Sequence, residues 1–218
     1  MIVAKQKPLE EIRQLIADYG RILVLGCDTC VAVCFAGGEK EAHILASALR
    51  MVEKLSGNPK EITEGAVKRQ CEWEFLDDIK DRINEVEAVL SLACGVGVQA
   101  LAERFPDKVI LPGVNTLFMG MPIEEGLFSE RCSGCGDCIL DQTGGICPVT
   151  RCAKGLLNGP CGGYRNGKCE VDPNRDCAWV LIYERLKQRG QLERLKEPGR
   201  LKNYSQMGHP RQITAKPI

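Results

Sequence analysis

Cysteine is the residue type in this chain whose number and spacing point most clearly to chemistry. The 218 residues include 13 cysteines. Eight fall within a short stretch near the carboxyl end: Cys132, Cys135, Cys138, Cys147, Cys152, Cys161, Cys169 and Cys177. Five precede them: Cys27, Cys30, Cys34, Cys71 and Cys94. The amino terminus is polar and unlike a secretory signal, so we expect a cytoplasmic protein whose thiols serve metal or redox chemistry rather than disulfides.

The spacing of the eight cysteines is typical of iron–sulfur proteins. Cys132-x-x-Cys135-x-x-Cys138 is the arrangement by which one loop supplies three thiolates to a cluster, and Cys147 precedes a proline as in bacterial ferredoxins. Eight thiolates suffice for two [4Fe–4S] clusters, which is our prediction. The ferredoxin rule would place the first three with a later cysteine such as Cys177, leaving a second set: Cys147, Cys152, Cys161 and Cys169. Zinc is the alternative, although it usually binds separated Cys-x-x-Cys pairs.

The composition around these cysteines also favours metal binding. Residues 132–177 contain only seven Ile, Leu or Val residues and nine glycines. Such a segment buries too little apolar surface to offset its backbone entropy. Metal–thiolate bonds can supply the missing free energy, because ligation becomes part of folding. We therefore expect residues 129–178 to form an iron–sulfur domain of ferredoxin-like character.

The elements that precede this domain alternate between helix and strand. Apolar runs predict strands over 21–26, within 61–70, over 88–93 and over 108–114. Helical periodicity predicts helices over 9–19, 39–55, about 73–83 and 98–105, and a further helix over 178–188. The predicted fold class is α/β: residues 1–128 form a small parallel sheet with flanking helices, and residues 179–218 form a helix and a basic tail.

This topology brings the five earlier cysteines together. Cys27, Cys71 and Cys94 follow the first, second and third predicted strands, while Cys30 and Cys34 lie on the loop after the first. Parallel strands end at one edge of their sheet, where such folds bind ligands. We expect a third metal site there, with four of the five thiols as ligands to zinc or to another [4Fe–4S] cluster. The alternative is that these cysteines are small apolar core residues.

Other features exclude several functional classes. The 29 basic residues balance the 29 acidic ones, so charge gives no argument for a nucleic-acid partner. No apolar run approaches the roughly 20 residues of a membrane span. Residues 95–100 (GVGVQA) match a dinucleotide-binding turn, but the acidic residue expected about 20 positions later is replaced by Val114-Asn115. A nucleotide-binding enzyme is therefore a minor alternative.

Several motifs resemble the MetV family, the small iron–sulfur subunits of acetogen-type bacterial methylenetetrahydrofolate reductase. The likeness lies in CAKGLLNGPCGG (152–163), GKCE (167–170) and CAWVLIY (177–183). It extends to GCDTCVAVCFAGGEKE (26–41), RQCEWEF (69–75), LACGVGVQ (92–99) and PGVNTLFMG (112–120), and so covers about residues 20–200. The family is also described as a methylenetetrahydrofolate reductase C-terminal-type domain.

The resemblance implies a partner and a role. The partner would be MetF, the catalytic subunit that carries FMN and reduces methylenetetrahydrofolate. The chain itself would be a non-catalytic subunit that passes electrons from ferredoxin or a further redox subunit to that flavin. The alternative is a zinc-stabilised assembly module that docks the catalytic subunit without carrying electrons.

Overall fold

A computed structural model describes residues 1–215, which form two compact units dividing after Ser129. The first unit, Met1–Ser129, holds most of the regular structure. Its elements are β1 (Ile2–Gln6), α1 (Leu9–Leu15), β2 (Arg21–Cys27), α2 (Cys30–Val33), α3 (Glu39–Leu55), β3 (Glu61–Val67), α4 (Trp73–Asp77), α5 (Lys80–Asn84), β4 (Ala88–Ser91), α6 (Gly95–Arg104), β5 (Val109–Pro112) and β6 (Val114–Glu124). After β7 (Leu127–Cys132), the second unit contains α7 (Pro148–Arg151), α8 (Ala178–Gln188) and the 3₁₀ helices η1 (Leu192–Leu195) and η2 (Tyr204–Met207).

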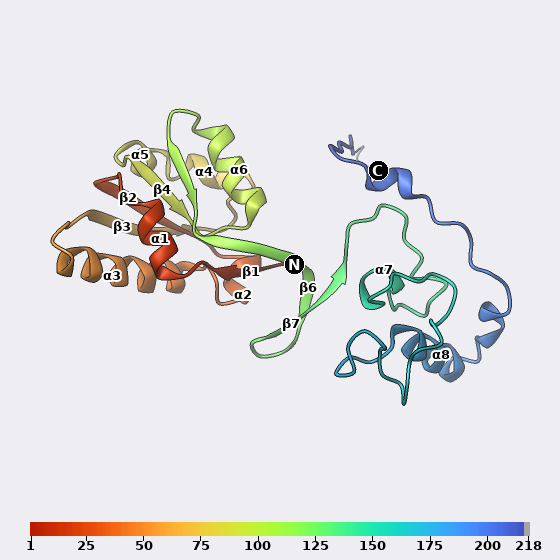
Figure 1. The fold of residues 1–218 in the computed structure, drawn as a ribbon. Coiled ribbons are helices and arrows are strands. Elements are labelled where there is room, and N and C mark those ends of the chain that lie inside the picture. Colours follow the sequence, from red (N-terminus) through yellow and green to blue (C-terminus); the bar gives the residue numbers. More distant parts are fainter. Residues whose placement is uncertain (216–218) are drawn as a thin grey trace. The chain divides into compact units, whose positions relative to one another are not determined.

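Four parallel strands form the centre of the first unit, in the order β3-β2-β4-β5. This confirms the predicted parallel α/β sheet. Alternate residues of β2 enter different apolar clusters, since Ile22 and Val24 pack with α1 and α3 while Leu23 and Leu25 pack with α4, α5 and α6. Helices therefore cover both faces, with α3 on one side and α4 to α6 on the other (Figure 1). Burial on both faces explains why the two central strands, β2 and β4, are largely apolar.

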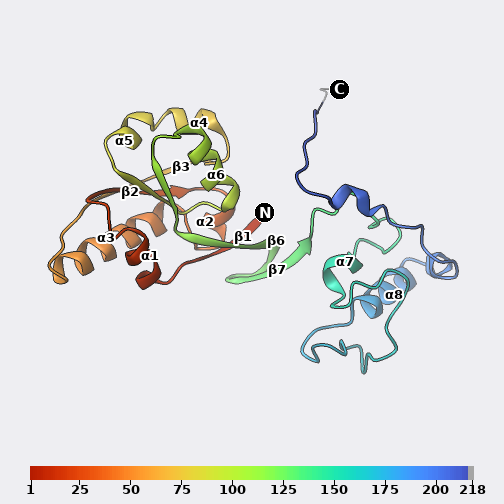
Figure 2. The ribbon, with the colours of Figure 1, turned by 45° about the horizontal axis from the view of Figure 1, so that its top comes forward.

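A three-stranded sheet, in the order β1-β6-β7, was not predicted from the sequence. β1 pairs antiparallel with β6, and residues 125–126 join β6 to β7 in a tight hairpin (Figure 2). The apolar side chains of Leu117, Met121 and Ile123 in β6 are exposed. The periodicity used to predict strands marks buried faces, and this ribbon buries little, so its signal was weak.

The predicted helix over residues 73–83 is two short helices, α4 and α5. The chain leaves helical geometry at Ile79, which precedes α5 with φ −113° and ψ 11°. Leu76 and Ile83 nevertheless enter the same apolar cluster. Burial of both side chains therefore produced the helical pattern even though the backbone between them is broken.

The second unit has a small apolar core and little regular structure. Its buried cluster consists of Ile146, Cys177, Trp179, Ile182 and Leu186, three of which belong to α8. The bounds of α8 agree with the predicted helix. Within residues 1–215, no helix is both long and apolar enough to cross a membrane.

Candidate metal centres

The strand order of the parallel sheet defines a preferred ligand position. β3 is added on one side of β2, whereas β4 and then β5 are added on the other side, so the order of strands switches between β2 and β4. In doubly wound sheets, ligands bind beyond the carboxyl ends of the strands at such a switch point. Cys27 is the last residue of β2, and Cys94 is the N-cap of α6, three residues after β4 ends. Two of the predicted ligands therefore flank the switch point.

Gln70 holds the segment that brings a third cysteine to this edge. Its side chain is fully buried; Nε2 donates to the carbonyl oxygens of Leu25 and Gly26, at 2.9 Å each. Its Oε1 accepts a hydrogen bond from Ser91 Oγ at 2.6 Å. Gln70 thus links β2 to β4 at their carboxyl ends and fixes the backbone directly before Cys71.

The pKa of the Cys71 thiol depends on burial and on two other cysteines of the first unit. Burial raises the pKa of the Cys71 thiol above its usual value, and Cys27 and Cys94 raise it further by charge repulsion. Cys71 therefore responds electrostatically to the cysteines that follow the two neighbouring strands β2 and β4, while a metal site formed by these thiols stays a prediction. The carbonyl oxygen of Cys30 accepts a hydrogen bond from Cys34 Sγ at 3.4 Å.

Cys34 differs from the other four cysteines of the first unit. Its Sγ donates to the carbonyl oxygens of Cys30 at 3.4 Å and of Ile2 at 3.7 Å. These two contacts to backbone carbonyls engage its sulfur, and this sets Cys34 apart from the other thiols of the first unit. A four-ligand set would therefore comprise the remaining thiols: Cys27, Cys30, Cys71 and Cys94.

The glycine-rich turn after β4 serves packing in this fold. A Cβ atom at Gly97 would lie 2.6 Å from the Cβ of Ala93 and 3.0 Å from that of Gln70. The backbone N–H of Gly95 donates to Thr116 Oγ1 at 2.8 Å. The backbone N–H of the first glycine is thus used by a protein hydrogen bond, and close packing accounts for the second glycine.

In the second unit, the first cysteine loop turns tightly and places a backbone N–H against one of its sulfurs. Gly134 and Gly136 both have left-handed φ angles, +64° and +81°, which let the loop fold tightly. The N–H of Gly134 donates to Cys132 Sγ at 3.3 Å. Backbone donors to sulfur are the interactions that adjust the properties of a bound cluster.

Cys147 and Cys152 bracket one short helix. Cys147 is the N-cap of α7 and Cys152 is its C-cap, so the Cys-Pro motif begins a single helical turn. Cys152 packs against the same apolar cluster that contains Cys177. Cys177 in turn is the N-cap of α8, and its N–H donates to the carbonyl of Gly167 at 2.7 Å.

The last two cysteines lie on the loops between these helices. Cys161 Sγ donates to Glu170 Oε2 at 3.2 Å, and Lys154 forms an ion pair with the same carboxylate. The N–H of Cys169 donates to the carbonyl of Arg175 at 2.9 Å. Backbone hydrogen bonds and polar contacts, rather than regular structure, therefore position this part of the unit.

The donor set suits thiolate-bound metal, but the side chains are not assembled around one. All 13 cysteines are free thiols. Among residues 1–215, no three or more Cys, His, Asp or Glu side chains are arranged so that they could hold a metal ion. Reduced thiols, a backbone donor to sulfur and left-handed glycines fit a cluster-binding loop. The ligand sets and their metals remain predictions.

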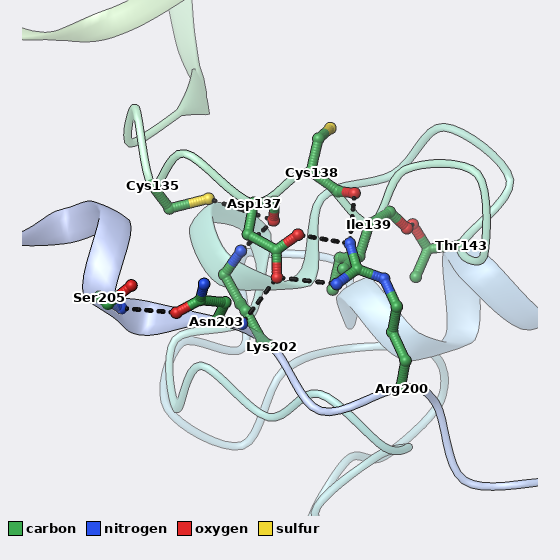
Figure 3. A network of polar contacts seen from close by, with 9 residues as sticks. All are labelled: Cys135, Asp137, Cys138, Ile139, Thr143, Arg200, Lys202, Asn203 and Ser205. Carbon is green, nitrogen blue, oxygen red and sulfur yellow. Dashed lines mark hydrogen bonds and ion pairs between the residues drawn. The ribbon is translucent and has the colours of Figure 1, made fainter. Parts of the chain in front are cut away.

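The segment after α8 makes a contact that sequence reasoning missed. Arg200 forms a two-pronged ion pair with Asp137, and the backbone N–H of Asn203 donates to the same carboxylate at 2.7 Å (Figure 3). These hydrogen bonds, led by Arg200, lower the pKa of Asp137 to about 2. The basic excess of the tail and one acid inside the cysteine loop were the available signals, but neither identified the pair.

Lys202 extends this contact to a predicted ligand. Its ammonium group donates to the carbonyl oxygen of Asp137, from which Cys135 Sγ lies 3.8 Å away (Figure 3). Burial by itself would raise the pKa of the Cys135 thiol, but hydrogen bonds from Lys202 and the backbone outweigh it and lower that pKa. The tail therefore favours the thiolate form of Cys135.

A comparison with protein families matches part of the chain. Residues 111–205 match the family described as methylene-tetrahydrofolate reductase C terminal. No curated protein and no solved structure matches the chain. The matched range runs from β5 through the second unit to η2, and so includes all eight cysteines of the second unit. By this match, residues 111–205 are similar to methylene-tetrahydrofolate reductase C-terminal domains.

Proposed function

We propose that the chain is an iron–sulfur electron-transfer subunit of a methylenetetrahydrofolate reductase complex. Electrons would pass from a cytoplasmic donor, such as ferredoxin or a further redox subunit, to flavin on the catalytic subunit. The observation that carries the proposal is the coincidence of eight free cysteines with a family match to residues 111–205. The MetV-like motifs add the finer assignment to the small subunit.

The energetics of the second unit support metal binding. Its buried apolar cluster has five members, and much of the chain between Cys132 and Cys177 lies in turns and loops. A core of that size stabilises few ordered residues, so folding needs another source of free energy. Eight thiolates could hold two [4Fe–4S] clusters, which supply one-electron chemistry when bound.

The first unit would contribute a further site at the switch point. Cys27, Cys71 and Cys94 lie at the carboxyl ends of three adjacent strands, and Cys30 lies on the first loop. Four thiolates suit zinc or a cluster equally well. Gln70 and the close packing at Gly97 would hold these loops in place whichever metal binds.

Metal analysis of protein purified without oxygen tests the proposal. We expect about eight irons per chain from two filled clusters, and visible absorbance that dithionite bleaches. A preparation containing zinc and no iron would contradict electron transfer. That result would favour a zinc-stabilised module that docks the catalytic subunit, because zinc has no redox chemistry.

A further inference from the structure

The residues after η1 form a segment that closes on the first cysteine loop. We call residues 200–211 the C-terminal arm, and residues 132–138 the first cysteine loop. Arg200 Nη1 and Nη2 lie 2.8 and 2.5 Å from the two carboxylate oxygens of Asp137. Nη2 also donates to the carbonyl of Cys138 at 3.1 Å. Two-pronged pairs of this kind combine strength with a fixed geometry.

Packing between the arm and the loop is as specific as the ion pair. A Cβ atom at Gly136 would lie 2.5 Å from the Cβ of Gln206, so the arm approaches the loop more closely than any other residue type would allow. At the far end of the arm, Arg211 Nη1 donates to the carbonyl of Gly134 at 2.6 Å. The arm thus contacts the loop at three successive points.

Lys202 is the buried charge within the arm. Only 9% of its surface is exposed, whereas lysine almost never lies buried without a partner. Its ammonium group donates to the carbonyl of Asp137, which Cys135 Sγ approaches at 3.8 Å, and it lies 5.7 Å from the ring centre of Tyr204. No acidic side chain forms a salt bridge with it in the described part of the chain. Its charge is therefore directed at the loop backbone and at one predicted ligand.

We propose that the C-terminal arm is a latch on the first cysteine loop, and that Lys202 is a positioning residue whose charge raises the reduction potential of the metal group held there. The second part rests on the proposed function, because only a redox-active group has a potential. Reduction adds negative charge to the thiolate-bound group, and a nearby buried cation stabilises that charge. The first part needs only a bound metal.

Three lysine variants of the full chain test the charge. Lys202→Met removes the charge and keeps an unbranched side chain, and Lys202→Arg keeps the charge. The matched control is Lys196→Met, which removes an exposed lysine that pairs with Glu193 near the start of the arm. In a redox titration followed by paramagnetic resonance, we expect a more negative midpoint potential for one signal in Lys202→Met only. An equal shift in the control, or no shift, would overturn the role of Lys202.

Arg200→Ala tests the latch by a readout that does not depend on redox chemistry. The loss of a two-pronged ion pair should speed metal release to a chelator by about tenfold. Release at the rate of the unaltered chain would overturn the latch. If the protein binds zinc alone, the proposed function and the role in potential both fail, and the release rate still decides the latch. If iron is present but Lys202→Met has the same midpoint potentials as the unaltered chain, the proposed function stands and the electrostatic role of Lys202 fails.

Discussion

Replacing Gln70 by leucine tests how the first unit positions its thiols. Leucine has a similar volume but makes none of the three buried hydrogen bonds to Leu25, Gly26 and Ser91. At about 0.5–1.5 kcal/mol for each bond, the loss is about 1.5–4.5 kcal/mol. Because these bonds join β2 to β4, we expect their loss to lower the free energy of opening of those two strands. Native-state hydrogen exchange on the full chain measures that quantity segment by segment.

The expected change is a fall in amide protection of β2 and β4 by roughly 10- to 2,000-fold, which is the same free energy expressed as an equilibrium constant. The matched control is Gln99→Leu, since Gln99 is exposed and makes a single local bond to the carbonyl of Gly95. The control should change stability by about 0.5 kcal/mol or less. Equal protection in the two variants would refute the role assigned to Gln70. Metal bound by the second unit should be unaffected in both.

Three further outcomes are expected. Gly97→Ala should lower stability by about 1–3 kcal/mol in the same exchange measurement, because the added methyl group would overlap Ala93. Gly95→Ala is the control, since a methyl group has room there, and equal losses in the two variants would contradict the packing argument. Arg50 lowers the pKa of Glu64, so the stability that this pair adds is present above the ordinary value of 4.5 and is lost as the pH falls through the lower folded value. Glu64→Gln should therefore reduce the acid dependence of first-unit stability, and an unchanged pH profile would count against it. Chelation of bound metal should abolish amide protection in the second unit and leave β2 and β4 protected; continued protection of the second unit would show that it folds without metal.

The parallel sheet was predictable because its central strands, β2 and β4, are buried on both faces. Continuous apolar runs such as residues 21–26 can form little else between helices, and each predicted parallel strand is present in the sheet. The β1-β6-β7 ribbon was missed for the opposite reason. Leu117 and Ile123 are exposed, so the pattern along β6 carries no information about a core.

The site could be predicted from the sequence only where the strand topology fixes the positions of its residues. Strand topology places Cys27, Cys71 and Cys94 after three adjacent strands of the sheet, while a metal site formed by them stays a prediction. Gln70 could not be identified, because a single polar residue gives no sign that it will be buried between two strands. The pair of Asp137 and Arg200 joins residues 63 positions apart in irregular segments, where no periodicity relates them.

Paramagnetic resonance combined with iron analysis, on the full chain purified without oxygen, tests the central claim most directly. The account predicts about eight irons per chain in the second unit and a signal that appears on reduction by dithionite. Iron in the second unit should persist in Cys94→Ser, which alters only the predicted site of the first unit. Zinc without iron, or thiols that bind no metal at all, would contradict the assignment of this chain as an electron-transfer subunit.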